Sequence, residues 1–412
     1  MPAIIKEEER NEKMEQFGML FFYEIKKIMQ RKSTWITLGI LLAIYLALTA
    51  GRTLGSSYVD GEFLETHKER NETDRKHGQK LSGRKLDDKL FEEMKNAYAG
   101  MEDKELKYML TDEYQTMVRP YSMVYDIVRF SDLNPFTVTE KTFYDARNAS
   151  VKKEWDNYEL TEKEKTYWQE KEEKLAKPFT YQYADGYSNL ISMNGIYMVC
   201  LWFSFLIAIC MSSVFTEEHG RKTDQLILCS RLGRTGIYFA KIAAGSLFSL
   251  LGMVFFLGIE AAGSFAAYGS EGFSAMVQLF YGTYSYPLTQ GQVFLIMTGI
   301  LLLTSVVTGI FTMVFSEITK SNISSMATVV AGLFLVRLIP IPLTWRFLSQ
   351  VWNFFPINML KLDAGFTDPR LISVLGWKFT SWQFVPVLYV LLAVLLIFVG
   401  KKVYCRYQVQ GR

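Results

Sequence analysis

The feature that most constrains this chain is a set of long apolar runs separated by polar connections. The runs cover residues 34–50, 191–214, 237–262, 293–315, 323–339 and 385–399. A helix needs roughly 20 apolar residues to cross a bilayer, so the longer runs meet this length and the first lies near its lower limit. Half of the residues are hydrophobic, which a soluble protein could also have, but the clustering is typical of membrane proteins. We therefore predict a mainly α, polytopic membrane protein with about six transmembrane helices.

The N-terminal region is predicted to lead into the first span along the membrane surface. Residues 1–13 are mostly charged and are expected to be disordered. Residues 14–32 have the periodicity of an amphipathic interfacial helix, which precedes a first transmembrane helix over residues 33–51. One arc of this helix is apolar (Phe17, Phe21, Phe22, Ile25, Ile28, Met29), and the opposite one is charged (Glu24, Lys27, Arg31). Lys26, Lys27, Arg31 and Lys32 are expected near anionic headgroups.

Residues 52–189 differ from the rest of the chain, because charges of both signs are dense and no run is long enough to span a membrane. Apolar residues recur there at helical spacing, as in Leu86, Leu90 and Met94. Thr161 followed by Glu164 fits a capping box at a helix start. We predict a helical domain inserted between the first two spans. The parity of the spans places it outside the cell.

The remaining residues, 190–412, are predicted to form transmembrane helices 2–6. The loop 215–236 reads FTEEHGRKTDQLILCSRLGRTG, and its Lys and Arg residues favour the cytoplasmic side. The segment 343–384 is predicted on the opposite side as a half-buried, re-entrant element, since it is apolar and rich in Trp and Phe. Lys401, Lys402 and Arg406 follow the last run, which puts both termini in the cytoplasm.

No motif in the sequence indicates catalysis. The chain lacks a Walker A sequence, a G-x-G-x-x-G sequence, a nucleophile–base grouping and a metal-ligand cluster. The formal net charge of +3 gives no support for nucleic-acid binding. We therefore expect a chain that is not an enzyme and holds no cofactor or metal of its own.

Two charged residues lie inside apolar runs, Glu260 in the third and Arg337 in the fifth. A charge that faces lipid at depth costs on the order of 3 kcal/mol on insertion scales, so each is a candidate functional charge that faces protein or water. The alternative is that both side chains extend to the headgroups. A direct pair between them has no support in the sequence.

Three stretches together are similar to a known family. They are EIKKIMQRKSTW before the first span, the loop 215–236, and FFPINML before the last span. The chain resembles the permease subunit of ABC-2 type transporters, which are type V exporters, in the Gram-positive variant with a large extracellular domain. The resemblance implies a multi-pass protein of the bacterial plasma membrane that exports a peptide, antibiotic or lipid-like substrate.

The same resemblance implies partners and a coupling site. A cytosolic ABC ATPase, a separate chain that holds ATP and Mg, would receive a coupling helix from the loop. The expected contact residues are Glu217, Glu218, Arg221, Lys222 and Thr223. A second permease copy or a paralogue would complete a dimer in the lipid bilayer. The alternative interpretation is a membrane-anchored sensor or scaffold that acts through residues 52–189.

Overall fold

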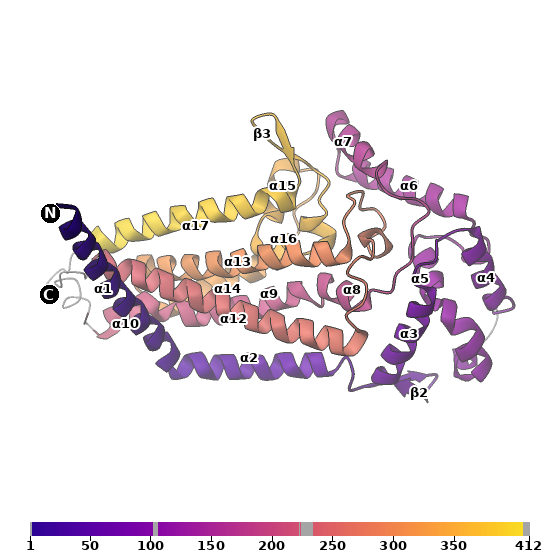
Figure 1. Cartoon of the computed structure of the whole chain (residues 1–412), viewed down its shortest axis with the longest axis horizontal. Helices are drawn as coiled ribbons and strands as arrows, with labels where there is room; N and C mark the ends of the chain where they lie inside the picture. Colours follow the sequence, from indigo (N-terminus) through magenta and orange to yellow (C-terminus); the bar gives the residue numbers. More distant parts are fainter. Residues whose placement is uncertain (1, 102–105, 222, 224–233, 407–412) are drawn as a thin grey trace.

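The described part of the chain is a bundle of long helices with an inserted domain at one end and a single helix across the other. The computed structural model describes residues 2–101, 106–221, 223 and 234–406. Figure 1 shows helix α1 (Pro2–Gln30) crossing one end of the bundle, where α17 also ends, and the inserted domain at the opposite end. We call these two ends the α1 end and the domain end.

The bundle is built from apolar helices that correspond to the predicted spans. They are α2 (Lys32–Ala50), α9 (Ile196–Met211) with its continuation α10 (Ser213–Arg221), α12 (Gly236–Tyr268), α13 (Gln290–Thr319), α14 (Asn322–Leu338) and α17 (Ser381–Arg406). Within the described residues, five helices are long and apolar enough to cross a membrane, and α14 has 17 residues. The predicted mainly α, polytopic membrane fold is confirmed.

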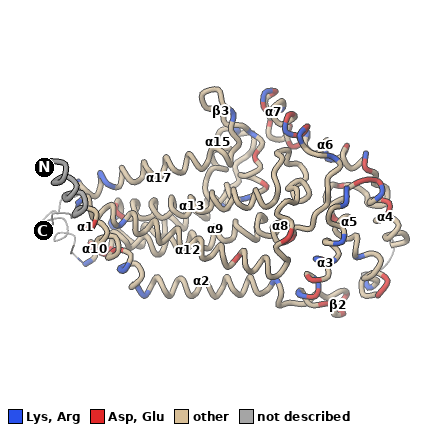
Figure 2. Tube along the Cα trace, in the orientation of Figure 1, with Lys and Arg blue, Asp and Glu red and all other residues tan. Residues whose placement is uncertain are grey.

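Charged residues lie mainly at the two ends of the molecule. Figure 2 shows Lys, Arg, Asp and Glu concentrated in the inserted domain and around the α1 end, whereas the helices between carry few. An ionised side chain in the hydrocarbon core is costly unless it is paired or reaches water. The middle of the bundle, where charges are few, is therefore the part that a bilayer would surround.

Helix α1 differs from expectation at its start. It begins at Pro2, so residues 2–13 continue the helix instead of being disordered. Ala, Glu, Lys and Arg in this stretch are strong helix formers, and proline is favoured at the first helical position because it lacks an N–H there. The helix ends at Gln30. Arg31 has extended backbone geometry before α2, which turns the chain from the bundle end into the first span.

The inserted domain contains a β-hairpin and several helices. The hairpin pairs β1 (Ser56–Val59) with β2 (Glu62–Thr66) in antiparallel fashion. The longer helices are α3 (His67–Leu81), α4 (Asp88–Tyr98), α5 (Ser122–Phe130), α6 (Glu140–Asn157), α7 (Glu162–Glu172) and α8 (Asp185–Ile191). Short 3₁₀ or π turns cover Leu106–Leu110, Tyr114–Val118 and Arg119–Tyr121. At the start of α7, the Glu164 carboxylate accepts the Thr161 backbone N–H at 2.8 Å, as the predicted capping box requires.

A separate apolar core holds this domain together. Leu86, Leu90, Phe91 and Met94 are completely buried in it. Leu86, Leu90 and Met94 recur at i, i+4 and i+8 spacing, with Phe91 beside Leu90, which places them on one face of α4 and of the turn before it. The loop after α12, which contains a short turn at Val277–Leu279, packs against the same core through Met276.

The segment between α14 and α17 folds at the domain end. It contains α15 (Arg346–Asn353), α16 (Pro356–Met359), a π turn (Leu362–Phe366) and a hairpin of β3 (Ile372–Val374) and β4 (Trp377–Phe379). Arg346 binds the Glu164 carboxylate of α7 at 2.6 and 2.8 Å. The Trp168 indole N–H donates to the Pro369 carbonyl at 2.6 Å. These contacts fix the segment against the inserted domain.

Glycines let neighbouring helices of the bundle approach closely. A Cβ added at Gly252 of α12 would lie 2.5 Å from the ring of Phe203 on α9, whereas one added at Gly258 of α12 would meet nothing within 4 Å. Small residues at helix contacts allow such close packing in membrane proteins. The two positions therefore form a matched pair on one helix.

We expect Gly252→Ala to destabilise the bundle by about 1–3 kcal/mol, because overpacking forces the ring and the helix apart. Gly258→Ala is expected to be neutral or to stabilise by up to about 1 kcal/mol, since alanine favours a helix over glycine. Unfolding of both purified variants in mixed micelles measures the difference. Equal stabilities for the two variants would contradict this packing.

Candidate functional site

The expected contact residues lie at the α1 end, where α9 continues as α10. Arg221 exposes 73% of its side chain, and its guanidinium binds Glu217 at 2.7 Å. The backbone N–H of Thr223 donates to the Glu218 carbonyl at 3.1 Å, which continues the turn of α10. Lys222 and residues 224–233 of the expected coupling loop lie outside the described residues. The first part of the predicted loop is thus a helix that extends the second span to Arg221.

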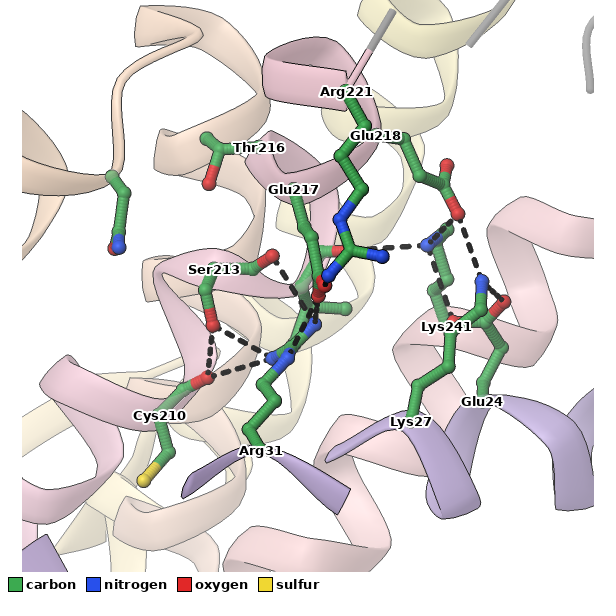
Figure 3. A network of polar contacts seen from close by, with 12 residues as sticks. Glu24, Lys27, Arg31, Cys210, Ser213, Thr216, Glu217, Glu218, Arg221 and Lys241 are labelled. Carbon is green, nitrogen blue, oxygen red and sulfur yellow. Dashed lines mark hydrogen bonds and ion pairs between the residues drawn. The ribbon is translucent and has the colours of Figure 1, made fainter. Parts of the chain in front are cut away.

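Glu218 faces into the protein and not toward a partner surface. Its Oε1 accepts the Lys241 ammonium at 2.8 Å and the Lys27 ammonium at 3.0 Å (Figure 3). Glu24 joins them, because its carboxylate binds Lys27 at 2.7 Å and Lys241 at 3.2 Å. Lys241 is 1% exposed and also donates to the Val214 carbonyl at 3.0 Å. We call Glu24, Lys27, Glu218 and Lys241 the four-charge cluster.

Arg31 forms a second connection beside this cluster. Its guanidinium binds the Glu217 carboxylate at 2.8 Å and the Ser213 hydroxyl at 2.7 Å (Figure 3). It also donates to the carbonyls of Cys210 and Ser213, at 3.4 and 3.3 Å. Charged hydrogen bonds of this kind are stronger than neutral ones. The junction between α1 and α2 is therefore bound to the point where α9 becomes α10.

The charged face of α1 turns toward the bundle, contrary to expectation. Lys27 and Arg31 were expected near headgroups, but they bind the carboxylates of α10, and Glu24 is buried. Phe22 and Tyr23, by contrast, are 71% and 62% exposed. The physical reason is that Lys241 and Glu218 already form a buried ion pair, to which Glu24 and Lys27 of α1 each add a further opposite charge. The arrangement ties α1, α10 and α12 into one unit.

A third polar contact joins α10 to the end of α13. The His219 ring lies 3.1 Å from the Glu317 carboxylate, and Glu317 is 0% exposed. Lys320, the residue that ends α13, binds the same carboxylate and lies 3.0 Å from His219. Lys320 has a left-handed backbone, with φ of 55°, which ends the helix and starts the tight turn into α14. Helix α10 thus contacts the end of α13, where the turn into α14 begins.

Glu260 is a buried charge at the domain end and not one that extends to headgroups. It is 0% exposed, and its carboxylate binds Arg52 at 2.7 Å. The Tyr45 hydroxyl donates to it at 2.5 Å, and the Asn189 amide at 3.4 Å. These partners come from α2, the residues after it, and α8. Glu260 therefore joins the first and third spans to the inserted domain.

Arg337 is exposed on α14 and makes no contact with Glu260. Its guanidinium lies 5.7 Å from the centre of the Tyr197 ring, a cation–π distance. The two charges that stand out in the apolar runs therefore belong to different environments. A charge that faces lipid is costly, so both residues were predicted to face protein or water. Only Glu260 is buried among ionic and polar partners.

Lys241 is the residue of the four-charge cluster that sequence reasoning did not select. It is the fifth residue of the apolar run 237–262, so it could be taken for the polar edge of a span. A single lysine in an apolar run indicates that a carboxylate elsewhere in the protein pairs with it, because an unpaired charge in this position is costly. The sequence did not say which of several nearby glutamates would be that partner.

Residues 76–400 match the family described as ABC-2 family transporter protein. The match covers more than half of the chain, so the chain belongs to this family. It is the membrane-spanning, permease type of component, which does not itself carry the catalytic step. No curated protein and no solved structure matches the chain significantly.

Proposed function

We propose that this permease subunit couples a separate cytosolic ABC ATPase to export across a bacterial plasma membrane. In this proposal the α1 end faces the cytoplasm and the inserted domain lies outside. Helix α10 and the residues that follow it, up to residue 235, provide the docking surface. The observation that carries the proposal is the four-charge cluster, because it links α10 to both α1 and α12 through buried ion pairs at 2.7–3.2 Å.

The cluster suits the transmission of a displacement. Separating an ion pair without a replacement partner leaves a buried charge uncompensated, at a cost of about 3–5 kcal/mol. Closure of an ATPase on ATP would move α10. Because breaking the pairs is costly, α12 and α1 would then move together with α10. ATP and Mg would be held by the ATPase. The permease contributes the moving helices, and a second copy or a paralogue completes the pathway.

The outward-facing side chains of α10 give this proposal a testable contact. Arg221 is largely exposed, so Arg221→Glu removes only a surface pair with Glu217, which is worth about 0–1 kcal/mol. If Arg221 binds an acidic group of the ATPase, however, the new carboxylate would repel that group. We expect about a tenfold loss of affinity for the ATPase, or ~1.4 kcal/mol.

The measurement is co-purification of tagged permease with its ATPase, followed by titration of the purified ATPase. Lys402→Glu is the control, because Lys402 is an exposed cation near the end of α17 at the same end of the bundle. The proposal requires that Arg221→Glu weakens binding and Lys402→Glu does not. Unchanged affinity in Arg221→Glu would show that α10 is not the docking element.

A further inference from the structure

A large cavity lies in the inserted domain. Its volume is about 1150 Å³, comparable with pockets that hold drug-sized ligands. Tyrosine rings and methionine side chains line much of it, including Tyr98, Tyr125, Met101, Met109 and Met123. Tyr98 and Tyr125 stack with ring centres 4.3 Å apart. Such a lining offers flat aromatic faces and adaptable thioethers to an apolar body.

Arg119, one of three arginines in the lining, is already neutralised. Arg119 binds Glu65 at 2.8 Å and Asp74 at 3.0 Å, and it also donates to Gln115 at 2.7 Å. Its guanidinium is therefore occupied and is not available to bind an anion. Of the other two arginines in the lining, Arg70 lies 3.7 Å from Asp74, and Arg129 interacts with Asp126 at longer range.

Two aspartates in the lining, Asp126 and Asp185, form no ion pair within the described residues. Asp126 has Arg129 and Arg70 at longer range, and burial still raises its pKa. Around Asp185 the strongest charged neighbour is a second carboxylate, Asp74. Burial and this like charge raise the pKa of Asp185 to about 6. Asp185 thus lies in a partly desolvated part of the wall and, among the described residues, has no cation paired with it.

Asp185 also lies where two cavities meet. Arg70, Asp74 and Asp185 line both the first cavity and a second one of about 580 Å³. The second cavity extends along α2 and α12 to Glu260. A group bound at Asp185 would therefore lie between the inserted domain and the helices of the bundle.

We propose that this cavity binds an amphipathic organic amine, with its ammonium group at Asp185 and its apolar body against Tyr98, Tyr125 and the methionines. An ammonium ion would provide the missing charge partner for Asp185. The aromatic faces add cation–π and apolar contacts. The site does not depend on coupling to an ATPase, because the inserted domain, including the start of α8, forms most of it.

The test uses dansylcadaverine, a fluorescent primary amine, with the full-length chain in lipid nanodiscs and no ATPase. Its N-acetylated derivative has the same apolar body without the charge. We expect saturable binding of the amine at pH 7.5, above the signal of empty nanodiscs, and at least tenfold weaker binding of the acetylated probe. Equal binding of both probes would overturn the proposal.

Two substitutions locate the site. Asp185→Asn is expected to weaken binding of the amine about tenfold and to remove the difference between the two probes. Asp145→Asn, on the exposed side of α6, should leave both affinities unchanged. Loss of binding in both variants, or in neither, would contradict the site. If Asp185→Asn does not fold, the comparison of the two probes on the unaltered chain still decides the matter.

The pH dependence gives an independent readout. The groups around Asp185 are Asp74 and Arg70 of α3, Asp126 of α5, Tyr181, Tyr183 and Tyr268. Because burial raises the pKa values of Asp185 and Asp126, both carboxylates lose their charge as the pH falls. Affinity for the amine should be full at pH 7.5 and decline through about pH 6. An affinity that is constant from pH 7.5 to pH 5 would contradict an ionised Asp185 at the site.

Discussion

Lys241→Met is expected to lower the free energy of unfolding by about 3–5 kcal/mol. The substitution keeps most of the side-chain volume but removes the ammonium that binds both Glu218 and Glu24. Lys27 alone then has to neutralise two carboxylates, and Glu24 and Glu218 are only 5% and 8% exposed. The Val214 carbonyl also loses its donor. Reversible unfolding of the purified chain in mixed micelles measures the change.

A double substitution separates the loss of an ion pair from a loss of packing. Lys241→Met together with Glu218→Gln removes one carboxylate along with the ammonium, so the chain should recover a large part of the lost stability. Lys402→Met, which changes an exposed lysine, should cost less than about 0.5 kcal/mol. If the double variant were as unstable as Lys241→Met, the charges of the cluster would not be the cause.

At the opposite end of the bundle, Glu260→Ala is expected to have an effect of similar size, about 3–5 kcal/mol. The change leaves the Arg52 guanidinium, 14% exposed, without its carboxylate, and Tyr45 without its acceptor. It also opens space between α2 and α12, which adds to the cost. The same micelle unfolding assay measures the change.

An exposed ion pair in the same region provides the control. Glu271 binds Arg75 near the inserted domain, but their side chains are 36% and 42% exposed, so Glu271→Ala should cost at most about 1 kcal/mol. Replacing both Arg52 and Glu260 by methionine should be milder than Glu260→Ala, since no charge is left buried. Equal losses for Glu260→Ala and Glu271→Ala would show that burial of Glu260 does not matter.

The membrane fold could be predicted because each span is a long apolar run that can be recognised from one continuous stretch of sequence. The run 34–50 became α2 (Lys32–Ala50), and the run 385–399 became the middle of α17 (Ser381–Arg406). The helices extend several residues beyond the predicted apolar runs, since polar residues at a membrane surface continue a helix as readily as apolar ones. The hairpin of β1 and β2 was missed because its nine residues of strand carry no clear alternation of apolar and polar side chains.

The site was harder to predict, because its contacts join residues far apart in the sequence. Glu218 and Lys241 are 23 residues apart, and Lys27 and Glu218 are 191 apart. Helical periodicity places a residue on a face but does not say which neighbour covers that face. Glu24, Lys27 and Arg31 were correctly placed on one arc of α1, yet that arc faces the bundle. Part of the apolar arc packs against the bundle as well, through Ile28, Phe21 and Ile25, whereas Phe22 stays exposed.

The most direct test of the coupling proposal is which end of the bundle faces the cytoplasm. A cysteine at Gly220, where an added Cβ meets nothing within 4 Å, and a cysteine at the exposed Asp145 can be introduced singly into a chain whose own cysteines are replaced. In intact cells, a membrane-impermeant thiol reagent should modify Asp145→Cys and leave Gly220→Cys unmodified until the membrane is permeabilised. Modification of Gly220→Cys in intact cells, with Asp145→Cys protected, would contradict a cytoplasmic docking site at α10.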